Sequence, residues 1–266
     1  MAPRALALRL LRETREELES GTEGPSHRYF QASLPRYLRI LEAIPAPPPR
    51  LRVLDVGVGW GHLAVCLQKL GHEIQGIDYF YEAEALARCE ARGIPVAIVN
   101  VETEGWAGAV GSFDVVLLAQ LLEHLSDSPL RPLEEVRRVL RPGGQVLLTT
   151  PNVAFVLNRL RLAFGRNIYP DLTPYYIGPK QAHVEGRLSA YRHHRLYTLH
   201  EVRWLLGKAG FRVVSARHIR SRERFHRDLR PAWLSRPLLA LSGLLPSLRE
   251  ELLVVAAKPG PGGTSP

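Results

Sequence analysis

The chain has few of the residues that would place it outside a reducing compartment or inside a membrane. Only two cysteines occur among its 266 residues, Cys66 and Cys89, and they have no metal-ligand spacing and provide no disulfide framework. No apolar run is long enough to cross a bilayer. Arg9, Arg12 and Glu13 interrupt the N-terminal apolar residues, so no signal peptide is expected. These absences predict a soluble, cytoplasmic protein.

Lysine is also scarce. Only four of the 35 basic residues are lysines, and the others are arginines. The net charge of +9 favours anionic partners such as nucleic acid, phospholipid headgroups or a phosphorylated substrate. The alternative is a basic charge spread over an ordinary surface. The hydrophobic content of 45% is sufficient for one large domain with a substantial core.

The most informative stretch of the chain is a short apolar run that ends in closely spaced glycines. It reads Val53-Leu54-Asp55-Val56-Gly57-Val58-Gly59-Trp60-Gly61. A buried parallel strand is typically such an apolar run followed by turn residues, and glycine lets the backbone turn sharply and approach a ligand. We therefore expect a strand over residues 52–56, a glycine loop, and a helix that begins near His62. This arrangement predicts a nucleotide site at the carboxyl edge of a sheet.

The rest of the chain alternates between strand and helix patterns. Strands are expected at 52–56, 73–78, 95–99, 113–118, 145–149, 211–216 and 251–258. Helices are expected at 62–70, at 81–92, around Leu133, Val136 and Leu140, at 153–164, and from Thr198 to 209. This alternation predicts an α/β fold, a doubly wound, mostly parallel, seven-stranded sheet with helices on both faces.

Composition divides the chain into a main domain and its flanking parts. Residues 1–49 are expected to form an N-terminal extension with helices over 4–19 and 27–43, closed by a proline-rich connector. Residues 50–258 form the main domain. Two insertions are expected in it, at about 153–197 and about 219–248, of which the first should cover the substrate. The Gly/Pro-rich residues 259–266 are predicted to be disordered.

The glycine spacing decides which nucleotide is expected. The dinucleotide fingerprint G-x-G-x-x-G would place its third glycine where this chain has His62, which disfavours NAD or FAD. The spacing instead resembles the first motif of class I S-adenosylmethionine-dependent methyltransferases. Further matches follow in order: Asp78 at the end of a strand, Gly111 to Val116 before Leu122-Glu123-His124, and Arg138 to Gly144 before another strand. The resemblance spans residues 30–258 in outline, with its specific motifs between 53 and 152. Within this superfamily, the chain resembles a bacterial type 11, ubiquinone O-methyltransferase-like branch.

The resemblance implies a Rossmann-like fold, S-adenosyl-L-methionine as cofactor, and a set of cofactor-binding residues. The set is Asp55, Gly57, Gly59, Gly61, Asp78, Asn100 and Gln120. Asp55 can hold the loop or meet the cofactor ammonium through a charge-assisted hydrogen bond. Asp78 can accept from both ribose hydroxyls, or it is simply a turn residue at a strand end. Asn100 stands where the family places a group near the adenine, or has a structural role.

The acceptor side of the predicted site begins after the strand over 113–118. A hydroxyl acceptor needs a base or a metal to lower its pKa, and His124 with Glu123 is the candidate pair for this. The alternative for His124 is a packing role. The stretch Ala119 to His124 also resembles a metal site of small-RNA 2′-O-methyltransferases, with His193 or His194 as a later ligand. Gln120 departs from the expected carboxylate, and a neutral amide is a poorer ligand for a hard cation, so no metal is expected.

The insertion at about 153–197 and the residue just before it supply the expected substrate-binding residues. They are Asn152, before the insertion, and Tyr176, His193, Arg195 and Tyr197 within it. Tyrosines could stack on a sugar or ring, and arginine and histidine could bind an anionic group. Interleaved arginines and aromatics are also typical of RNA binding, and a lid that only seals the cofactor is a third reading.

These patterns together predict an S-adenosylmethionine-dependent methyltransferase that methylates oxygen on a small-molecule, glycan or lipid acceptor. The alternatives are an RNA 2′-O-methyltransferase and a non-catalytic cofactor-binding module. Nucleic acid is possible as a partner but not favoured. Six arginines between Arg217 and Arg230 precede the apolar residues 233–245, a pattern that suggests peripheral contact with an anionic membrane. A solvated connector followed by a packed helix is the preferred reading of this segment.

Overall fold

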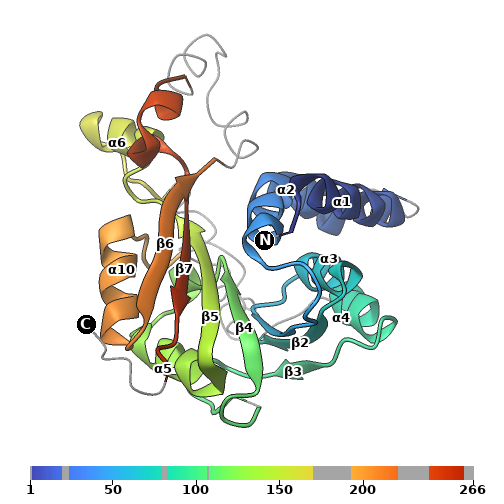
Figure 1. Cartoon of the computed structure of the whole chain (residues 1–266). Coiled ribbons are helices and arrows are strands. Elements are labelled where there is room, and N and C mark those ends of the chain that lie inside the picture. The colour runs from blue at the N-terminus through green and yellow to red at the C-terminus, as the bar shows by residue number, and fades with distance from the viewer. Residues whose placement is uncertain are drawn as a thin grey trace, which may run out of the picture.

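A seven-stranded sheet forms the centre of the computed structural model, which describes residues 2–19, 24–79, 83–106, 108–169, 193–220 and 240–260 (Figure 1). The strands are β1 (Arg52–Val56), β2 (Glu73–Asp78), β3 (Val96–Ile98), β4 (Phe113–Ala119), β5 (Leu140–Pro151), β6 (Arg212–Ile219) and β7 (Glu251–Ala257). Their order across the sheet is β3-β2-β1-β4-β5-β7-β6. Strands β1 to β5 pair in parallel, and β7 pairs antiparallel with β5 and β6. The predicted doubly wound, mostly parallel seven-stranded sheet is confirmed.

Helices cover both faces of the sheet (Figure 1). They are α1 (Arg4–Glu19), α2 (Pro25–Ala43), α3 (His62–Leu70), α4 (Ala83–Glu90), α5 (Leu130–Val139), α6 (Val156–Ala163) and α10 (Leu199–Lys208), with short 3₁₀ helices η1 (Leu122–His124) and η2 (Pro246–Leu248). One apolar cluster joins the sheet to α5 and α10, and another joins it to α1, α2 and α3. Leu54 belongs to the first cluster and Val53 to the second. Both faces of β1 are therefore buried, as expected of a central parallel strand.

The strand order fixes the place of the site. From β1 the chain builds outward through β2 to β3, and it then crosses back to β4 on the other side of β1. Ligands of doubly wound sheets bind at the carboxyl ends of the strands where this reversal occurs. The residues that follow β1 and β4 therefore face a common crevice.

The turn from α5 into β5 differs from its prediction. Leu140 was expected in the helix, but α5 ends at Val139 and Leu140 begins β5, where it pairs with Phe113. The residue sequence explains the change, because Pro142 restricts the backbone before it and cannot continue a helix. Gly144 follows, and a Cβ there would lie 2.9 Å from the Arg141 carbonyl oxygen.

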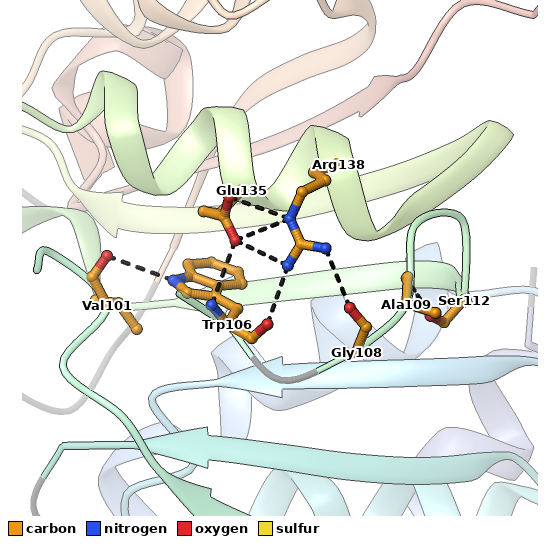
Figure 2. Close-up of polar contacts among 7 residues, drawn as sticks. All are labelled: Val101, Trp106, Gly108, Ala109, Ser112, Glu135 and Arg138. Carbon is orange, nitrogen blue, oxygen red and sulfur yellow. Dashed lines mark hydrogen bonds and ion pairs between the residues drawn. The ribbon is translucent and has the colours of Figure 1, made fainter. Parts of the chain in front are cut away.

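The loop between β3 and β4 is held to α5 by Arg138 (Figure 2). Its guanidinium donates to the carbonyl oxygens of Trp106 (3.0 Å) and Gly108 (3.1 Å) and pairs with Glu135 (2.9 Å). Hydrogen bonding from Arg138 lowers the pKa of Glu135. The Trp106 indole N–H donates to the Val101 carbonyl (3.4 Å). The arginine of the predicted Arg138–Gly144 motif therefore organises a loop of the scaffold.

The N-terminal helices pack into the main domain. Phe30, Ile40 and Leu41 of α2 are fully buried in the cluster shared with α3 and β1. Arg36 of α2 is also buried and pairs with Glu251 of β7 at 3.1 Å. The division at residue 50 stays a prediction, but α2 contributes directly to the core beneath it.

Several predictions concern residues that lie outside the described part of the chain. These are Tyr176, most of the expected insertions, and nearly all of the predicted tail. Among the described helices, none combines the length and apolar character needed to cross a membrane.

Candidate cofactor and acceptor site

The glycine loop after β1 forms one wall of the crevice. Gly57, Gly59 and Gly61 have φ values of +80°, +54° and +75°, which side chains with a Cβ rarely adopt. The Gly57 N–H donates to the Ile77 carbonyl at 2.8 Å, which ties the loop to β2. A Cβ at Gly61 would lie 2.9 Å from Cys89 Sγ. The loop therefore requires glycine for its conformation and, at Gly61, also for space.

Asp78 at the end of β2 holds this loop. Its carboxylate accepts the N–H of Gly59 (2.6 Å) and the N–H of Tyr79 (2.8 Å). Asp78 is half-buried, and a carboxylate has about four acceptor positions, so it can also accept from a ligand. The structure thus shows the turn role that was one of the two readings of this residue. The ribose role stays a prediction.

Asp55 lies at the base of the loop with an unsatisfied oxygen. The residue is 1% exposed, and its Oδ1 has no hydrogen-bond donor among the described residues. Burial, together with the charge of Asp78, raises the pKa of Asp55 to about 7. A buried acceptor without a partner is costly, which makes a donor from a bound ligand a natural complement.

His62, at the position of the missing third glycine, has a packing role. Its buried ring lies 3.0 Å from Ser26 Oγ through Nε2 and meets Phe30 edge-on at 5.1 Å between ring centroids. Burial and the nearby Arg88 lower its pKa to about 3, so the ring is neutral. His62 therefore joins the cofactor loop to helix α2, a role that the sequence alone did not indicate.

The turn after β4 forms the opposite wall. Gln120 has φ = +61°, the sole positive value at a non-glycine position within the described ranges. Its Nε2 is buried and finds no acceptor among those residues. A Cβ at Gly57 would lie 3.3 Å from Leu121 Cδ1. Backbone strain at a non-glycine residue often marks a functional site, and here the next residue, Leu121, lies close to the glycine loop.

The two residues expected to act as general base, Glu123 and His124, lie in the next part of this turn, in η1. Glu123 is fully buried, and its Oε2 accepts the Thr150 hydroxyl at 2.9 Å. Its Oε1 has no donor within the described chain. Burial raises the pKa of Glu123 to about 7, against the lowering effects of Thr150 and of the Arg36 charge. This carboxyl can therefore exchange a proton near neutral pH.

His193 joins Glu123 and His124 although it is far away in sequence. One ligand atom from each of the three side chains lies within 4.8 Å of the others, and the two imidazole rings are 4.8 Å apart at 73°. The N–H of His194 donates to the Glu123 carbonyl at 2.7 Å, which fixes the approach of this segment. Two imidazoles and a carboxylate can relay a proton, and they are also a ligand set for a divalent metal.

Three other predicted residues make structural contacts. The amide of buried Asn152 donates to the carbonyls of Ser247 (3.0 Å) and Arg249 (2.8 Å). Tyr197 is 3% exposed within an apolar cluster. The Asn100 side chain accepts the N–H of Glu102 at 3.0 Å, which stabilises a turn. Their predicted ligand roles stay untested, and each residue has a sufficient structural reason to be present.

Arg195 lies at the surface of the same region. It pairs with Glu201 at 2.8 Å and lies over the Tyr197 ring at 5.5 Å from its centroid. The helix expected from Thr198 is present as α10, and a capping box begins it, since Thr198 and Glu201 bond reciprocally. This cap positions the segment that carries His193.

Comparison with known proteins identifies the family. A family model described as "Methyltransferase domain" matches residues 27–216, from α2 to β6. The chain belongs to this methyltransferase domain family.

Individual relatives agree with the family assignment. A ubiquinone biosynthesis O-methyltransferase of Cereibacter sphaeroides is 36% identical over 110 residues, which cover 41% of this chain and 44% of the relative. One of Xanthomonas campestris pv. campestris is 33% identical over 134 residues, 48% of this chain and 56% of the relative. The chain thus spans about half the length of the curated relatives that it matches.

Solved structures support the fold. An S-adenosylmethionine-dependent methyltransferase from Mesorhizobium loti aligns with a TM-score of 0.54 and 21% identity over 85% of this chain and 97% of that chain. At this identity the similarity shows the fold alone, and the chemistry must be argued from the site.

Proposed function

We propose that this protein transfers a methyl group from S-adenosylmethionine to a hydroxyl oxygen of a small-molecule, glycan or lipid acceptor. The observation that carries the proposal is the close approach of the turn after β4 to the glycine loop, where a Cβ added at Gly57 would lie 3.3 Å from Leu121 Cδ1. It brings the Glu123–His124–His193 group next to a glycine loop of the methyltransferase family.

The residues of the loop fit the cofactor. The unsatisfied Oδ1 of Asp55 suits an ammonium group, and the unsatisfied Nε2 of Gln120 suits an acceptor atom. The accessible carboxylate of Asp78 suits vicinal hydroxyls. When bound, S-adenosylmethionine would supply an electrophilic methyl group. The named residues would hold it in a fixed orientation, which is the main requirement of an in-line transfer.

The acceptor proton would leave through the Glu123–His124–His193 group. A hydroxyl is a weak nucleophile until a base takes its proton, and the effective pKa of such a base lies near the working pH. We assign proton acceptance to His124, with the Glu123 carboxylate to orient the imidazole and stabilise its charged form. His193 would contact the acceptor or complete the relay. Relatives named ubiquinone biosynthesis O-methyltransferase support oxygen as the acceptor atom.

Two measurements test the proposal in turn. Calorimetry with S-adenosylhomocysteine should show binding that Asp78→Ala weakens by about tenfold or more, because this change removes acceptors for two hydroxyls. Failure of the wild type to bind would end the proposal.

Cell extract incubated with the protein and isotopically labelled cofactor should then yield a labelled methyl ether, detected by mass spectrometry. Glu123→Gln is the matched variant: it preserves shape and should retain cofactor binding but lose labelling. Binding without any labelled product would instead indicate a cofactor-binding module. A cytoplasmic location is part of the proposal, and cell fractionation tests it.

A further inference from the structure

Two segments near the carboxyl edge of the sheet expose large apolar side chains. At the end of α6, Leu162 is 60% exposed and Phe164 is 78% exposed. Before η2, Leu241, Leu244 and Leu245 are 40%, 80% and 51% exposed. Isolated exposed leucines are ordinary, but five large exposed apolar side chains in two segments at one edge of the sheet are the kind of feature that marks an interaction surface.

Hydrogen bonds join the residue just before α6 to the segment that precedes β7. Asn152, just before α6, donates to the carbonyls of Ser247 and Arg249, and the Arg249 guanidinium donates to the Ser242 carbonyl at 3.3 Å. In Figure 1, α6 and the red segment that precedes β7 both lie at the end of the sheet where β5 finishes. We name Leu162, Phe164, Leu241, Leu244 and Leu245 the apolar surface.

The charge within the two segments that carry the apolar surface has one sign, and the first acidic residues, Glu250 and Glu251, follow directly after them. Residues 153–169 and 240–249 contain Arg159, Arg161, Arg166 and Arg249 and no aspartate or glutamate. Arg159 and Arg166 are exposed. A second copy of the chain would bring these arginines against each other, and it would also carry a net charge of +9. An anionic partner with an apolar interior complements both the leucines and the arginines.

We propose that the apolar surface docks on an anionic phospholipid bilayer, with Phe164 and Leu244 in the headgroup–acyl boundary and Arg159 and Arg166 at the phosphates. Membrane docking goes beyond the proposed function. For a methyltransferase, docking has a consequence for how the acceptor reaches the site. The docked edge of the sheet is the one that carries Glu123 and His124, so an amphiphilic acceptor could reach the site from the membrane surface.

Sedimentation with vesicles tests the proposal. Vesicles of phosphatidylcholine containing phosphatidylglycerol should bind the protein, and vesicles of phosphatidylcholine alone should bind it more weakly. Phe164→Ser and Leu244→Ser should each lower the partition coefficient by about tenfold, as expected for removing one large apolar group from the interface. Joint Arg159→Gln and Arg166→Gln changes should lower binding to the anionic vesicles only, and added salt should have the same effect.

Val110→Ser is the matched control. Val110 is 72% exposed, and it lies in the turn before β4, at the opposite edge of the sheet from the apolar surface. This variant should leave vesicle binding unchanged. Equal losses in Val110→Ser and Phe164→Ser would overturn the proposal, as would binding that does not depend on phosphatidylglycerol. A dimer abolished by Phe164→Ser, without vesicle binding, would assign the surface to a second copy. Unchanged affinity for S-adenosylhomocysteine in every variant shows that the fold is intact, and vesicle binding needs no methyl transfer.

Discussion

The proposed contact between Asp55 and the cofactor ammonium predicts how cofactor affinity depends on pH. Its pKa of about 7 means that at about pH 6 roughly a tenth of the folded protein has the ionised carboxylate, and at about pH 8 roughly nine-tenths has it. If the cofactor ammonium binds the carboxylate, affinity for S-adenosylhomocysteine should rise by about tenfold across this interval. The affinity should level off above it.

The stability of the cofactor-free protein should change with pH in the opposite direction. The pKa of Asp55 is raised above its ordinary value of 3.8, so the folded cofactor-free protein holds a proton that the unfolded chain releases. Stability is therefore fully retained below the ordinary value and is lost as pH rises toward about 7. Raising the pH should weaken the free protein while it strengthens the complex.

Calorimetry in buffers of different ionisation enthalpy measures both the affinity and the protons exchanged. The wild type should release close to one proton on binding at about pH 6, and Asp55→Asn should bind weakly with no release. Glu123→Gln is the control, because Glu123 also titrates near 7 but should not contact the ammonium. A pH slope that persists in Asp55→Asn, or one that disappears in Glu123→Gln, would refute the assignment.

Three further predictions concern the groups around the site. Arg36→Met leaves Glu251 buried without its partner and should lower the free energy of unfolding, measured by urea denaturation, by about 3–5 kcal/mol. The double variant Arg36→Met with Glu251→Leu should recover most of this loss. Thr150→Val removes a hydrogen bond that favours ionised Glu123, so the acid limb of the pH–rate profile should move up by about one unit. Chelation with EDTA should leave the rate unchanged, since Gln120 contributes an amide where a carboxylate would favour a hard cation; a loss restored by Mn²⁺ or Zn²⁺ would contradict this.

The fold could be predicted because its signals are local. The alternation of apolar strands and amphipathic helices sets the sheet, and the glycine loop marks its switch point. Leu140 was misplaced because its apolar spacing fits the helix before it as well as the strand that it begins. The pairing of Leu140 with Phe113 is a tertiary contact that no local pattern encodes.

The site was predictable only in part, because some of its residues meet through tertiary contacts that local patterns do not encode. Glu123 and His124 adjoin in sequence, and their proximity follows at once. His193 was one of two candidates, and only the cap at Thr198 and the bond from His194 to Glu123 bring it to them. Thr150 was not predicted as a site residue, because a threonine within a strand is ordinary. Asn152 looked like a ligand-binding residue, and only the course of the chain before β7 shows that its amide binds backbone.

Helix α2 shows how far the site extends beyond the sheet. Near its start Ser26 meets His62, the first residue of α3 after the cofactor loop. Further along α2, Arg36 pairs with Glu251, and its charge lowers the pKa of Glu123. A buried ion pair adds little net stability compared with apolar packing, so stability alone does not explain Arg36. Its positive charge instead opposes the effect of burial on Glu123 and favours the ionised carboxylate that the proposed relay requires. Because α2 both contacts His62 beside the cofactor loop and acts through the charge of Arg36 on Glu123, a displacement of α2 would loosen the cofactor loop and raise the pKa of Glu123 together.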